Sequence, residues 1–350
     1  MISSLRLQQF RSYTDASFEF DAGVNIVVGP NACGKTNLLE AVLVLAKGSS
    51  YRAKPAELIK FGKPWGRLDA FFERQSRVLK LEESPEGARR TILIDDQPFT
   101  RLSLDRTVPI VLFEPNNLQL LIRGPETRRE YLDDLLTQTV EGYKTMLAGY
   151  KRAVSQRNSL LKKEHLTKDQ LFVWNVRISE LGGGIVSARQ ALIEQMNKVL
   201  SKSYSAVAQK KSNLQAVYRP TVAVENYSSS LLKKLEASTQ LDQARGFTAY
   251  GPHREDVLFE LNKEPAEHSA SRGETRTILL ALKIFELEQL EAARGQKPIL
   301  LLDDVFSELD ASRRRYLVEF LKNHQTIIST TDADAVVQHF TGNYNTIALN

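Results

Sequence analysis

Apolar residues alternate with polar ones, or form short runs, over most of the first 113 residues. This pattern is typical of β-strands, whose side chains point to opposite faces in turn. One helical pattern interrupts it, because apolar residues from Leu38 to Leu45 recur at helical spacing and stop at Gly48. We therefore expect a β-rich region with an early helix, and strands near residues 2–7, 18–20, 24–28, 68–72, 78–81, 91–94 and 108–113.

The spacing becomes helical after Gly124 and Pro125. Apolar residues recur at helical intervals over residues 132–154, and a second helix is predicted over residues 171–181. We expect a third helix to begin after the three consecutive glycines at 182–184. These patterns predict a helical insertion between two α/β parts of the chain.

Strand patterns return beyond the helical region. They are separated by a long apolar helix from about residue 277 to residue 293, which is expected to end at Gly295. The strands are predicted over residues 214–218, 257–261, 298–302 and 326–329.

The composition is that of an ordinary globular protein. The chain has 350 residues, of which 42% are hydrophobic and 25% charged, and this length predicts about two domains. No apolar run is long enough to span a bilayer, and the first residues lack the layout of a signal peptide. A single cysteine excludes an intrachain disulfide and a cysteine-based zinc site. We expect a cytoplasmic protein with no membrane association, and the net charge of +5 is compatible with nucleic acid binding.

A phosphate-binding loop follows the strand expected at 24–28. The segment fits the pattern G-x-x-x-x-G-K-[ST], and the flanking strand and helix argue against a chance match in a glycine-containing turn. Backbone N–H groups and the helix N-terminus would form an anion site for the phosphates of ATP. We expect Lys35 to reach the β- and γ-phosphates and Thr36 to hold Mg²⁺. The loop consists of Gly29, Pro30, Asn31, Ala32, Cys33, Gly34, Lys35 and Thr36.

Two aspartates end the strand expected at 298–302. An acidic residue at the carboxyl end of a buried parallel strand faces the ligand crevice. We expect Asp303 to hold Mg²⁺, directly or through water, and Asp304 to act as the general base that polarises the attacking water. Two solvated turn aspartates are the alternative, which leaves the phosphate loop without an acidic partner.

Arg11 and Tyr13 lie shortly before the phosphate loop. An arginine and an aromatic residue at this place are candidates to cover the base or the phosphates of a nucleotide. A polar loop with packed amphipathic side chains explains the residues equally well.

Ser271, Gly273 and Glu274 directly precede the long helix. Ser271 and Glu274 have the spacing of a capping box, in which each side chain satisfies a backbone N–H of the other. The order of phosphate loop, this segment, acidic strand end and Asp310 also resembles that of ABC-type ATPase heads. In such heads the signature segment contacts the γ-phosphate bound by a second subunit, and a helix N-terminus would supply a favourable dipole.

The chain resembles the RecF family of the ABC/SMC superfamily over nearly its whole length. The Gly-Pro-His-Arg-acidic stretch at 251–256 and the Asp-Asp strand end are typical of this family rather than of ABC heads in general. The resemblance implies an α/β fold, namely an ABC-type ATPase head with a phosphate loop, a mixed sheet and a helical insertion domain. It is carried by residues 8–13, 29–41, 48–62, 124–134, 246–256, 264–277 and 298–310.

The resemblance also implies a function. Members of the family form ATP-dependent homodimers that bind single- and double-stranded DNA near gaps. They hydrolyse ATP slowly, with stimulation by DNA, and the hydrolysis acts as a switch that releases the DNA. With RecO and RecR they help to load RecA onto gaps coated by single-strand-binding protein, in recombinational repair and replication restart.

Three segments are expected on this basis. Residues 1–113 would form the first half of the ATPase head, with the phosphate loop. Residues 114–245 would form the helical insertion, a lid or DNA-binding domain. Residues 246–350 would form the second half, with the signature segment, the acidic strand end and Asp310.

Basic residues of the helical region are candidate DNA contacts. A solvated helix face is the ordinary explanation for such residues, and some of them are also spaced to pair with Asp133 and Asp134. Contact with DNA phosphates is the alternative, and it would appear as salt-dependent binding. The candidates are Arg128, Arg129, Lys151 and Arg152.

The chain departs from the family pattern at three places. Ala32 and Cys33 stand where the family usually has glycine followed by glutamine or serine, so we expect a thiol reagent to block ATP binding and Mg-ATP to protect against it. Asn116 and Asn117 replace a usual Glu-Asp pair in a nucleotide-sensing loop. Thr331 stands where ABC transporters carry a switch histidine, which suggests slow turnover.

Other classes of phosphate-loop protein fit less well. An ABC transporter ATPase needs a membrane partner, and an SMC-like chromosome-structuring protein needs long heptad arms. A simple kinase has no use for a signature segment contributed by a second subunit. ATP-induced dimerisation would distinguish an ABC transporter ATPase, an SMC-like protein or a RecF family member from a kinase. DNA-stimulated ATP turnover would distinguish a RecF family member from a transporter.

Overall fold

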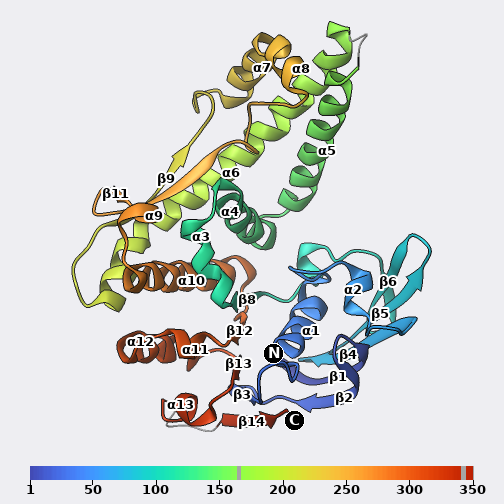
Figure 1. The fold of residues 1–350 in the computed structure, drawn as a ribbon, viewed down its shortest axis with the longest axis vertical. Coiled ribbons are helices and arrows are strands. Elements are labelled where there is room, and N and C mark those ends of the chain that lie inside the picture. The colour runs from blue at the N-terminus through green and yellow to red at the C-terminus, as the bar shows by residue number, and fades with distance from the viewer. Residues whose placement is uncertain (164–166, 340–343, 350) are drawn as a thin grey trace. The chain divides into compact units, whose positions relative to one another are not determined.

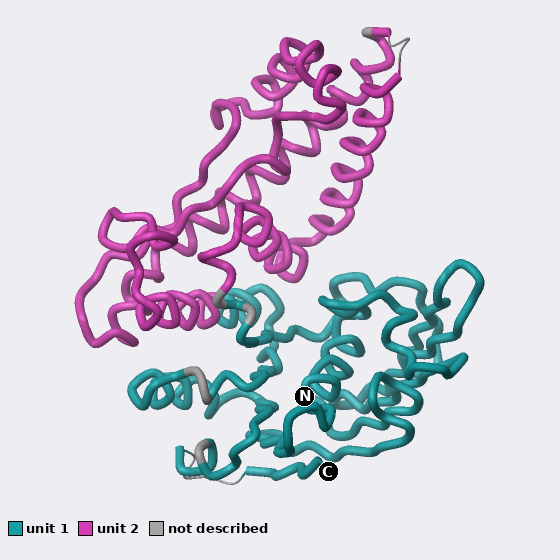
Figure 2. Tube along the Cα trace, viewed as in Figure 1, with its two compact units in different colours: residues 1–117, 286–350 teal, residues 118–285 magenta. Residues whose placement is uncertain are grey.

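The computed structural model describes residues 1–163, 167–339 and 344–349. Within them the chain forms two compact units, one of residues 1–117 and 286–350 and the other of residues 118–285 (Figure 2). The first boundary lies close to the expected one at 113/114. The second lies forty residues beyond the expected one at 245/246, because the strand that begins at Asp256 pairs with the strand at 214–219 of the insertion.

Unit 1 contains two sheets. The first is antiparallel, with strand order β2-β1-β4-β5-β6-β7. It places one face of each strand on a shared core, as the alternating pattern predicts. Its strands are β1 (Ile2–Phe10), β2 (Tyr13–Glu19), β4 (Trp65–Phe72), β5 (Gln75–Ser84), β6 (Gly87–Ile94) and β7 (Gln97–Phe99).

The second sheet of unit 1 is parallel throughout, with strand order β14-β3-β13-β12-β8. Its central strands are buried along almost their whole length, as expected when a parallel sheet is covered on both faces. Its strands are β3 (Val24–Val28), β8 (Ile110–Phe113), β12 (Ile299–Asp303), β13 (Thr326–Thr330) and β14 (Tyr344–Ala348).

Helix α1 (Lys35–Lys47) joins the two sheets of unit 1 into one core. Its apolar residues, from Leu38 to Ala46, pack with side chains from β1, β4, β5, β12 and β13 (Figure 1). The helix ends at Gly48, which adopts a left-handed φ of 79° and confirms the expected stop. The shorter helices of this unit are α2 (Pro55–Leu58), α11 (Val305–Glu308), α12 (Ala311–Leu321) and α13 (Ala333–Val337), and short 3-10 turns span Leu104–Arg106 and Pro115–Leu118.

Unit 2 is mainly helical. A small antiparallel sheet of order β11-β10-β9 packs beside helix α6 (Lys168–Ala208) (Figure 1). Helix α10 (Arg272–Arg294) begins in unit 2 and crosses the division at residues 285/286. The other elements are α3 (Gln119–Ile122), α4 (Pro125–Thr139), α5 (Tyr143–Leu161), β9 (Leu214–Arg219), α7 (Tyr227–Ala237), α8 (Thr239–Arg245), β10 (Asp256–Leu261), β11 (Glu264–Pro265) and α9 (Ala266–Ser269).

Two expectations for the helical region are wrong. The glycines at 182–184 do not separate two helices, since α6 runs through them as one helix of 41 residues. Conversely, the single pattern over 132–154 contains two helices, because the chain turns at Gly142, where φ is 77°.

The three glycines have a packing role instead. A Cβ atom on Gly183 would lie 2.0 Å from the Oγ of Ser228 in α7, and one on Gly184 would lie 2.5 Å from the Sδ of Met146 in α5. The glycines therefore allow two neighbouring helices to approach α6 closely, and this contact outweighs the cost of about 1 kcal/mol for each glycine in a helix interior. Among the described residues, no helix is both long and apolar enough to cross a membrane.

Candidate nucleotide-binding site

Three neighbouring strands of the parallel sheet end at the same edge. In β3, β13 and β12, Val28 pairs with Thr330, and Ser329 pairs with Asp303. Because parallel strands place their carboxyl ends together, the phosphate loop after β3 meets Asp303 and Asp304 after β12. The two sequence motifs, which lie 267 residues apart at their contact, thus form one site.

The loop backbone requires glycine at two positions. Gly34, the N-cap of α1, has a φ of 109°, and a Cβ atom there would lie 2.8 Å from the Oγ of Ser12. A Cβ atom on Gly29 would lie 2.6 Å from the backbone oxygen of Leu349. Tyr13 donates a hydrogen bond of 3.0 Å to the Gly34 carbonyl, so the aromatic residue supports the loop from behind, and burial raises the pKa of its phenol.

Ala32 has an unusual backbone conformation. Its φ is 67°, in the left-handed region that is costly for any residue with a Cβ atom. A glycine would adopt this φ without that cost. The loop has the left-handed conformation here although the residue is an alanine.

Lys35 is 7% exposed and lies at the start of α1. Its ammonium donates hydrogen bonds to the carbonyl oxygens of Gly29 and Pro30, at 2.7 and 2.8 Å. The loop thus wraps around the side chain and holds its charge where the anion site of the loop is expected.

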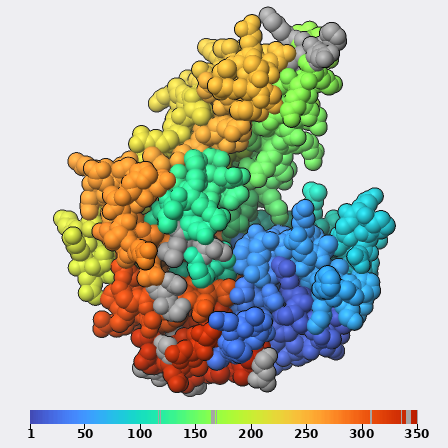
Figure 3. Space-filling model, viewed as in Figure 1, coloured from blue at the N-terminus to red at the C-terminus, as the bar shows by residue number. Residues whose placement is uncertain are grey.

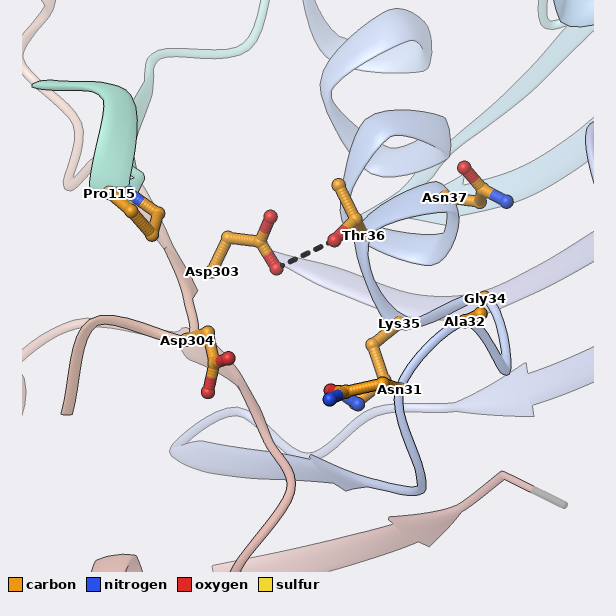
Figure 4. A pocket seen from close by; sticks show the side chains of 9 residues that line it. All are labelled: Asn31, Ala32, Gly34, Lys35, Thr36, Asn37, Pro115, Asp303 and Asp304. Atoms are coloured by element: carbon orange, nitrogen blue, oxygen red, sulfur yellow. Dashed lines mark hydrogen bonds between the residues drawn. The ribbon is translucent and has the colours of Figure 1, made fainter. Parts of the chain in front are cut away.

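Asp303 joins the helix to the sheet. Its Oδ1 accepts a hydrogen bond from Thr36 Oγ1 at 3.0 Å (Figure 4). The same oxygen accepts another from Ser329 Oγ at 2.6 Å. The backbone N–H of Asp304 donates to the same Ser329 hydroxyl at 3.0 Å. Ser329 therefore positions both aspartates, and Asp304 adopts a left-handed φ of 54° as the first residue beyond the strand.

The phosphate loop, the start of α1 and the two aspartates line a cavity of about 320 Å³. Its polar lining comes from the loop, from the first turn of α1 and from the two aspartates (Figure 4). A hydroxyl beside a carboxylate is an oxygen donor set that suits Mg²⁺, and the loop and Lys35 suit phosphate groups. The lining residues are Asn31, Ala32, Gly34, Lys35, Thr36, Asn37, Pro115, Asp303 and Asp304.

Arg11 does not line this cavity. Its guanidinium donates two hydrogen bonds of 2.9 Å to the carboxylate of Glu40, and one more to the carbonyl of Glu57. Arg52 and Ser50 also donate to Glu40, which is 1% exposed. The proposed contact of Arg11 with a nucleotide is therefore replaced in the structure by an ion-paired cluster on α1.

The environment of Glu40 strongly favours its charged form. Burial alone would raise the pKa of this carboxyl, but hydrogen bonds from Arg52, Arg11 and Ser50 outweigh it and bring the pKa down to about 2. Arg52 also donates to Asn37, which in turn donates to Ser12 beside the loop. The cluster thus links the interior of α1 to the phosphate loop.

The signature segment forms the expected capping box. Ser271 Oγ accepts from the backbone N–H of Glu274 at 3.3 Å, and Glu274 accepts from the backbone N–H of Ser271 at 2.9 Å. The hydrogen bonds that the backbone N–H and the hydroxyl of Ser271 donate to the carboxylate lower the pKa of Glu274. Ser271, Gly273 and Glu274 belong to unit 2 and are not among the residues that line the cavity.

Asp310 is the N-cap of α12. Its carboxylate accepts from the backbone N–H of Arg313 at 3.0 Å and also pairs with the Arg313 guanidinium, and these contacts lower its pKa. Asp310 does not line the cavity either.

The candidate DNA contacts differ in their surroundings. Arg128 is 4% exposed, and its guanidinium donates to both carboxylate oxygens of Asp256, at 2.9 and 2.8 Å. It is therefore a buried structural residue and not an exposed phosphate contact, and its partner is not on its own helix as the spacing suggested. Arg129 is half-buried, whereas Lys151 and Arg152 are exposed on α5.

Some residues of interest lie partly outside the described set. The side chain of Asn116 is not described. Asn117 accepts a hydrogen bond from the backbone N–H of Glu114, so it shapes the turn before Pro115, which lines the cavity. Thr331 is exposed just after β13.

Sequence reasoning missed Ser329 and Glu40. Ser329 is one of several small polar residues at the end of an apolar run, and only its register against Asp303 marks it. The sequence did contain a signal for Glu40, because a charged residue among the apolar positions of a helix indicates a buried charge with a partner.

Comparison with known proteins identifies the family. A family model described as the RecF/RecN/SMC N terminal domain matches residues 1–346. A DNA replication and repair protein RecF of Lachnoclostridium phytofermentans is 33% identical over 349 residues, which cover 97% of this chain and 95% of the relative. The chain belongs to the RecF family. Another member, from a Cyanothece species, is 35% identical and covers 95% of this chain and 92% of its own.

Solved RecF structures have the same fold. The recombination mediator protein RecF-ATP in the RecFOR pathway has a TM-score of 0.86 and 32% identity, and the match covers 95% of this chain and 92% of that one. The RecF-ATPrS structure has the same TM-score with 30% identity, over 96% and 94% of the two chains. An SMC head bound to ScpA has a TM-score of 0.52 at 15% identity, over 96% and 91% of the two chains. The expected ABC-type head with a helical insertion is thus confirmed as the fold.

Proposed function

We propose that this member of the RecF family binds ATP with Mg²⁺ at the phosphate loop, and that ATP controls its binding to DNA in recombinational repair and replication restart. One observation carries the proposal. Thr36 and Ser329 both donate to Asp303 at the edge of a cavity lined by the phosphate loop. Two similarities support it: relatives of this chain are DNA replication and repair proteins, and a RecF structure with ATP has the same fold.

The residues have distinct roles in this proposal. Lys35 and the loop N–H groups bind the phosphates, and Thr36 with Asp303 holds the metal ion, which neutralises charge on the phosphates. Asp304 orients and polarises the attacking water as a general base. Slow hydrolysis, stimulated by DNA, then acts as a switch that releases the DNA.

The active assembly in the proposal is an ATP-dependent homodimer. Ser271, Gly273 and Glu274 of one copy close the nucleotide site of the other, with Asp310 nearby. Its substrates are gapped, single-stranded and double-stranded DNA, and its partners are RecR and RecO, with which it helps to load RecA. An SMC-like chromosome-structuring ATPase is the alternative class, because an SMC head shares the fold.

Lys35→Arg tests the coupling of ATP to DNA. The larger, planar guanidinium cannot take the place of the ammonium between two loop carbonyls, so we expect ATP turnover and ATP-dependent DNA retention to be lost while the fold is kept. Lys63→Arg, at an exposed lysine of the same unit, is the matched control. Full ATP-dependent retention of DNA by Lys35→Arg would rule out the coupled switch.

Ser271→Arg tests the dimer. The variant should still bind ATP but fail to dimerise, because a bulky cation occupies the contact with the other copy. Ser271→Ala loses the same hydrogen bonds of the Ser271 hydroxyl, at a cost of about 1 kcal/mol, but adds no bulk, so it should still dimerise. Normal ATP-induced dimers of Ser271→Arg in light scattering would show that the signature assignment is wrong.

A further inference from the structure

Two stretches with the family pattern, about 120 residues apart, meet within unit 2. The first begins α4, at residues 124–134, and the second precedes β10, at residues 246–256. Arg128 pairs with Asp256, and Arg129 donates to the carbonyl of Glu255 at 2.6 Å. In the space-filling view, the green surface of α4 borders the orange surface of the later segment (Figure 3).

The two stretches line a cavity of about 540 Å³ that is open to solvent. Its charged lining consists of Arg123, Arg129, Arg254 and one acid, Glu126. The three arginines and the acid leave a net charge of about +2 around the cavity, since arginine is always protonated. A concave wall of this charge attracts an anion.

Arginines elsewhere in unit 2 show how unusual this lining is. The buried Arg128, Arg157 and Arg189 each form an ion pair with an aspartate, at 2.7 to 2.9 Å. In contrast, Arg123, Arg129 and Arg254 have no carboxylate within 4.0 Å among the residues that the structure describes. Arg129 is half-buried and Arg123 and Arg254 are exposed, so all three guanidinium groups are accessible to an external anion, which is the partner that this lining lacks.

Arg129 has the clearest need for such a partner. Burial lowers its pKa, and the neighbouring charge of Arg189 lowers it further. The more distant carboxylates of Asp256, Glu126 and Asp133 raise the pKa but do not offset this lowering. Its guanidinium donates to one backbone carbonyl, whereas Arg254 stacks over the ring of Phe247 at 4.6 Å and donates to the carbonyl of Thr248. These contacts orient both guanidinium groups without neutralising them.

Two further features suit an anion. Gly124, the N-cap of α4, provides no side-chain cap, so the dipole of this 15-residue helix is directed at the cavity wall without a capping oxygen. His253 is neutral at pH 7, because burial lowers its pKa to about 4. Its ring bonds to Tyr150 and to the Thr248 carbonyl, so it shapes the wall and adds no charge.

We propose that this cavity is a phosphate-binding site that takes a phosphate group of a DNA strand, either a backbone phosphodiester or a terminal phosphate. Guanidinium groups match the geometry of phosphate oxygens and form charge-assisted hydrogen bonds with them. The choice of DNA as the source rests on the proposed function. The site is separate from the phosphate loop, which belongs to the other unit.

The test uses the full chain and two opposite changes. Arg123→Gln with Arg254→Gln removes two exposed cations from the cavity, and Glu126→Gln removes its acid. Arg177→Gln, at an exposed arginine on α6 that pairs with Glu180, is the matched control. DNA binding is measured against salt concentration, with 5′-phosphorylated and unphosphorylated strands of the same sequence.

The double arginine variant should bind DNA more weakly than the wild type. Its plot of log K for DNA binding against log[salt] should also be less steep by about 1 to 2, because each phosphate contact contributes about 0.9 to the steepness. Glu126→Gln should bind more tightly than the wild type, a gain that a merely structural role does not produce. If the double arginine variant loses affinity for both kinds of strand, the site binds a backbone phosphate. If it loses affinity only for phosphorylated strands, the site binds the terminal phosphate. Wild-type affinity and slope in the double variant would overturn the proposal.

Failure of the proposed function has a different signature. If the wild type binds no DNA in any condition, the DNA-binding function fails, and the cavity is then tested with inorganic phosphate. Phosphate should raise the unfolding temperature of the wild type and of Arg177→Gln more than that of the double arginine variant. If phosphate raises the unfolding temperature of all three proteins equally, the cavity is not a phosphate-binding site.

Discussion

Glu40→Gln would show how strongly the ion-paired cluster on α1 stabilises the unit that holds the phosphate loop. The change keeps the size of the side chain but removes its charge. Glutamine keeps one acceptor oxygen but replaces the other with an NH2 group, so it cannot accept all the hydrogen bonds that Arg11, Arg52 and Ser50 donate to the two carboxylate oxygens of Glu40. Two arginines thereby lose their common anion.

The magnitude follows from the pKa of Glu40, which falls from an ordinary value of 4.5 to about 2. At 1.36 kcal/mol for each tenfold change in proton affinity, this difference corresponds to about 3 kcal/mol. The side chains of Arg11 and Arg52 are 22% and 34% exposed, so solvent screens part of the interaction. We expect Glu40→Gln to lower the free energy of unfolding by about 2 to 3 kcal/mol at pH 7.

The effect also depends on pH, with a definite sign. Because the folded state depresses the pKa, the contribution of Glu40 is fully present above pH 4.5 and is lost as the pH falls towards 2. By pH 3.5 about 1.4 kcal/mol of it should be gone, since the unfolded chain then binds a proton that the folded protein excludes. The variant has no carboxylate at this position to titrate. The difference in the free energy of unfolding between the wild type and Glu40→Gln should therefore become smaller in acid.

Urea unfolding at pH 7 and at pH 3.5 would measure both effects. With an m-value of about 2 kcal/mol/M, the midpoint of Glu40→Gln should fall by about 1 M at pH 7 and by roughly half as much at pH 3.5. Glu73→Gln breaks an ion pair that is 60% exposed on both sides and should change little. An unchanged midpoint at pH 7, or the same difference at both pH values, would refute the reasoning.

Three further outcomes are expected. Ser329→Ala removes the 2.6 Å hydrogen bond to Asp303 and should weaken Mg²⁺-dependent ATP binding about tenfold, and an unchanged titration would contradict its positioning role. Gly183→Ala places a Cβ atom 2.0 Å from the Ser228 hydroxyl and should destabilise the protein by about 1 to 3 kcal/mol. Ser228→Ala should then recover much of that loss in thermal unfolding, which a helix-propensity effect would not explain. Modification of Cys33 by a thiol reagent should block ATP binding, and Mg-ATP should protect it, whereas modification at the same rate with and without nucleotide would place the thiol away from the phosphates.

Several features could be predicted because their signals are local. The phosphate loop, the acidic strand end and the capping box of Ser271 each depend on residues within a few positions of one another. The end of α1 at Gly48 is of the same kind, since a left-handed helix stop favours glycine whatever packs around it.

Other features depended on contacts between distant segments. The glycines at 182–184 looked like a break between helices, because propensity disfavours glycine within a helix. Only the approach of Ser228 and Met146 shows that they serve close packing in one continuous helix. Likewise, the pairing of β10 with β9 assigned residues beyond 245 to unit 2, and no local pattern marks that boundary.

The sequence by itself determined the chemistry that the chain carries, namely a loop shaped for phosphates, two adjacent aspartates and a set of basic residues. The tertiary structure decided which partner each charge takes. Arg11 pairs with Glu40, and Arg128 pairs with Asp256 across 128 residues. Within the described part of the chain, Arg129 has no carboxylate within 4.0 Å. A charge in a folded chain is stabilised by whatever group packing brings within a few ångströms, and that distance is unrelated to separation along the sequence.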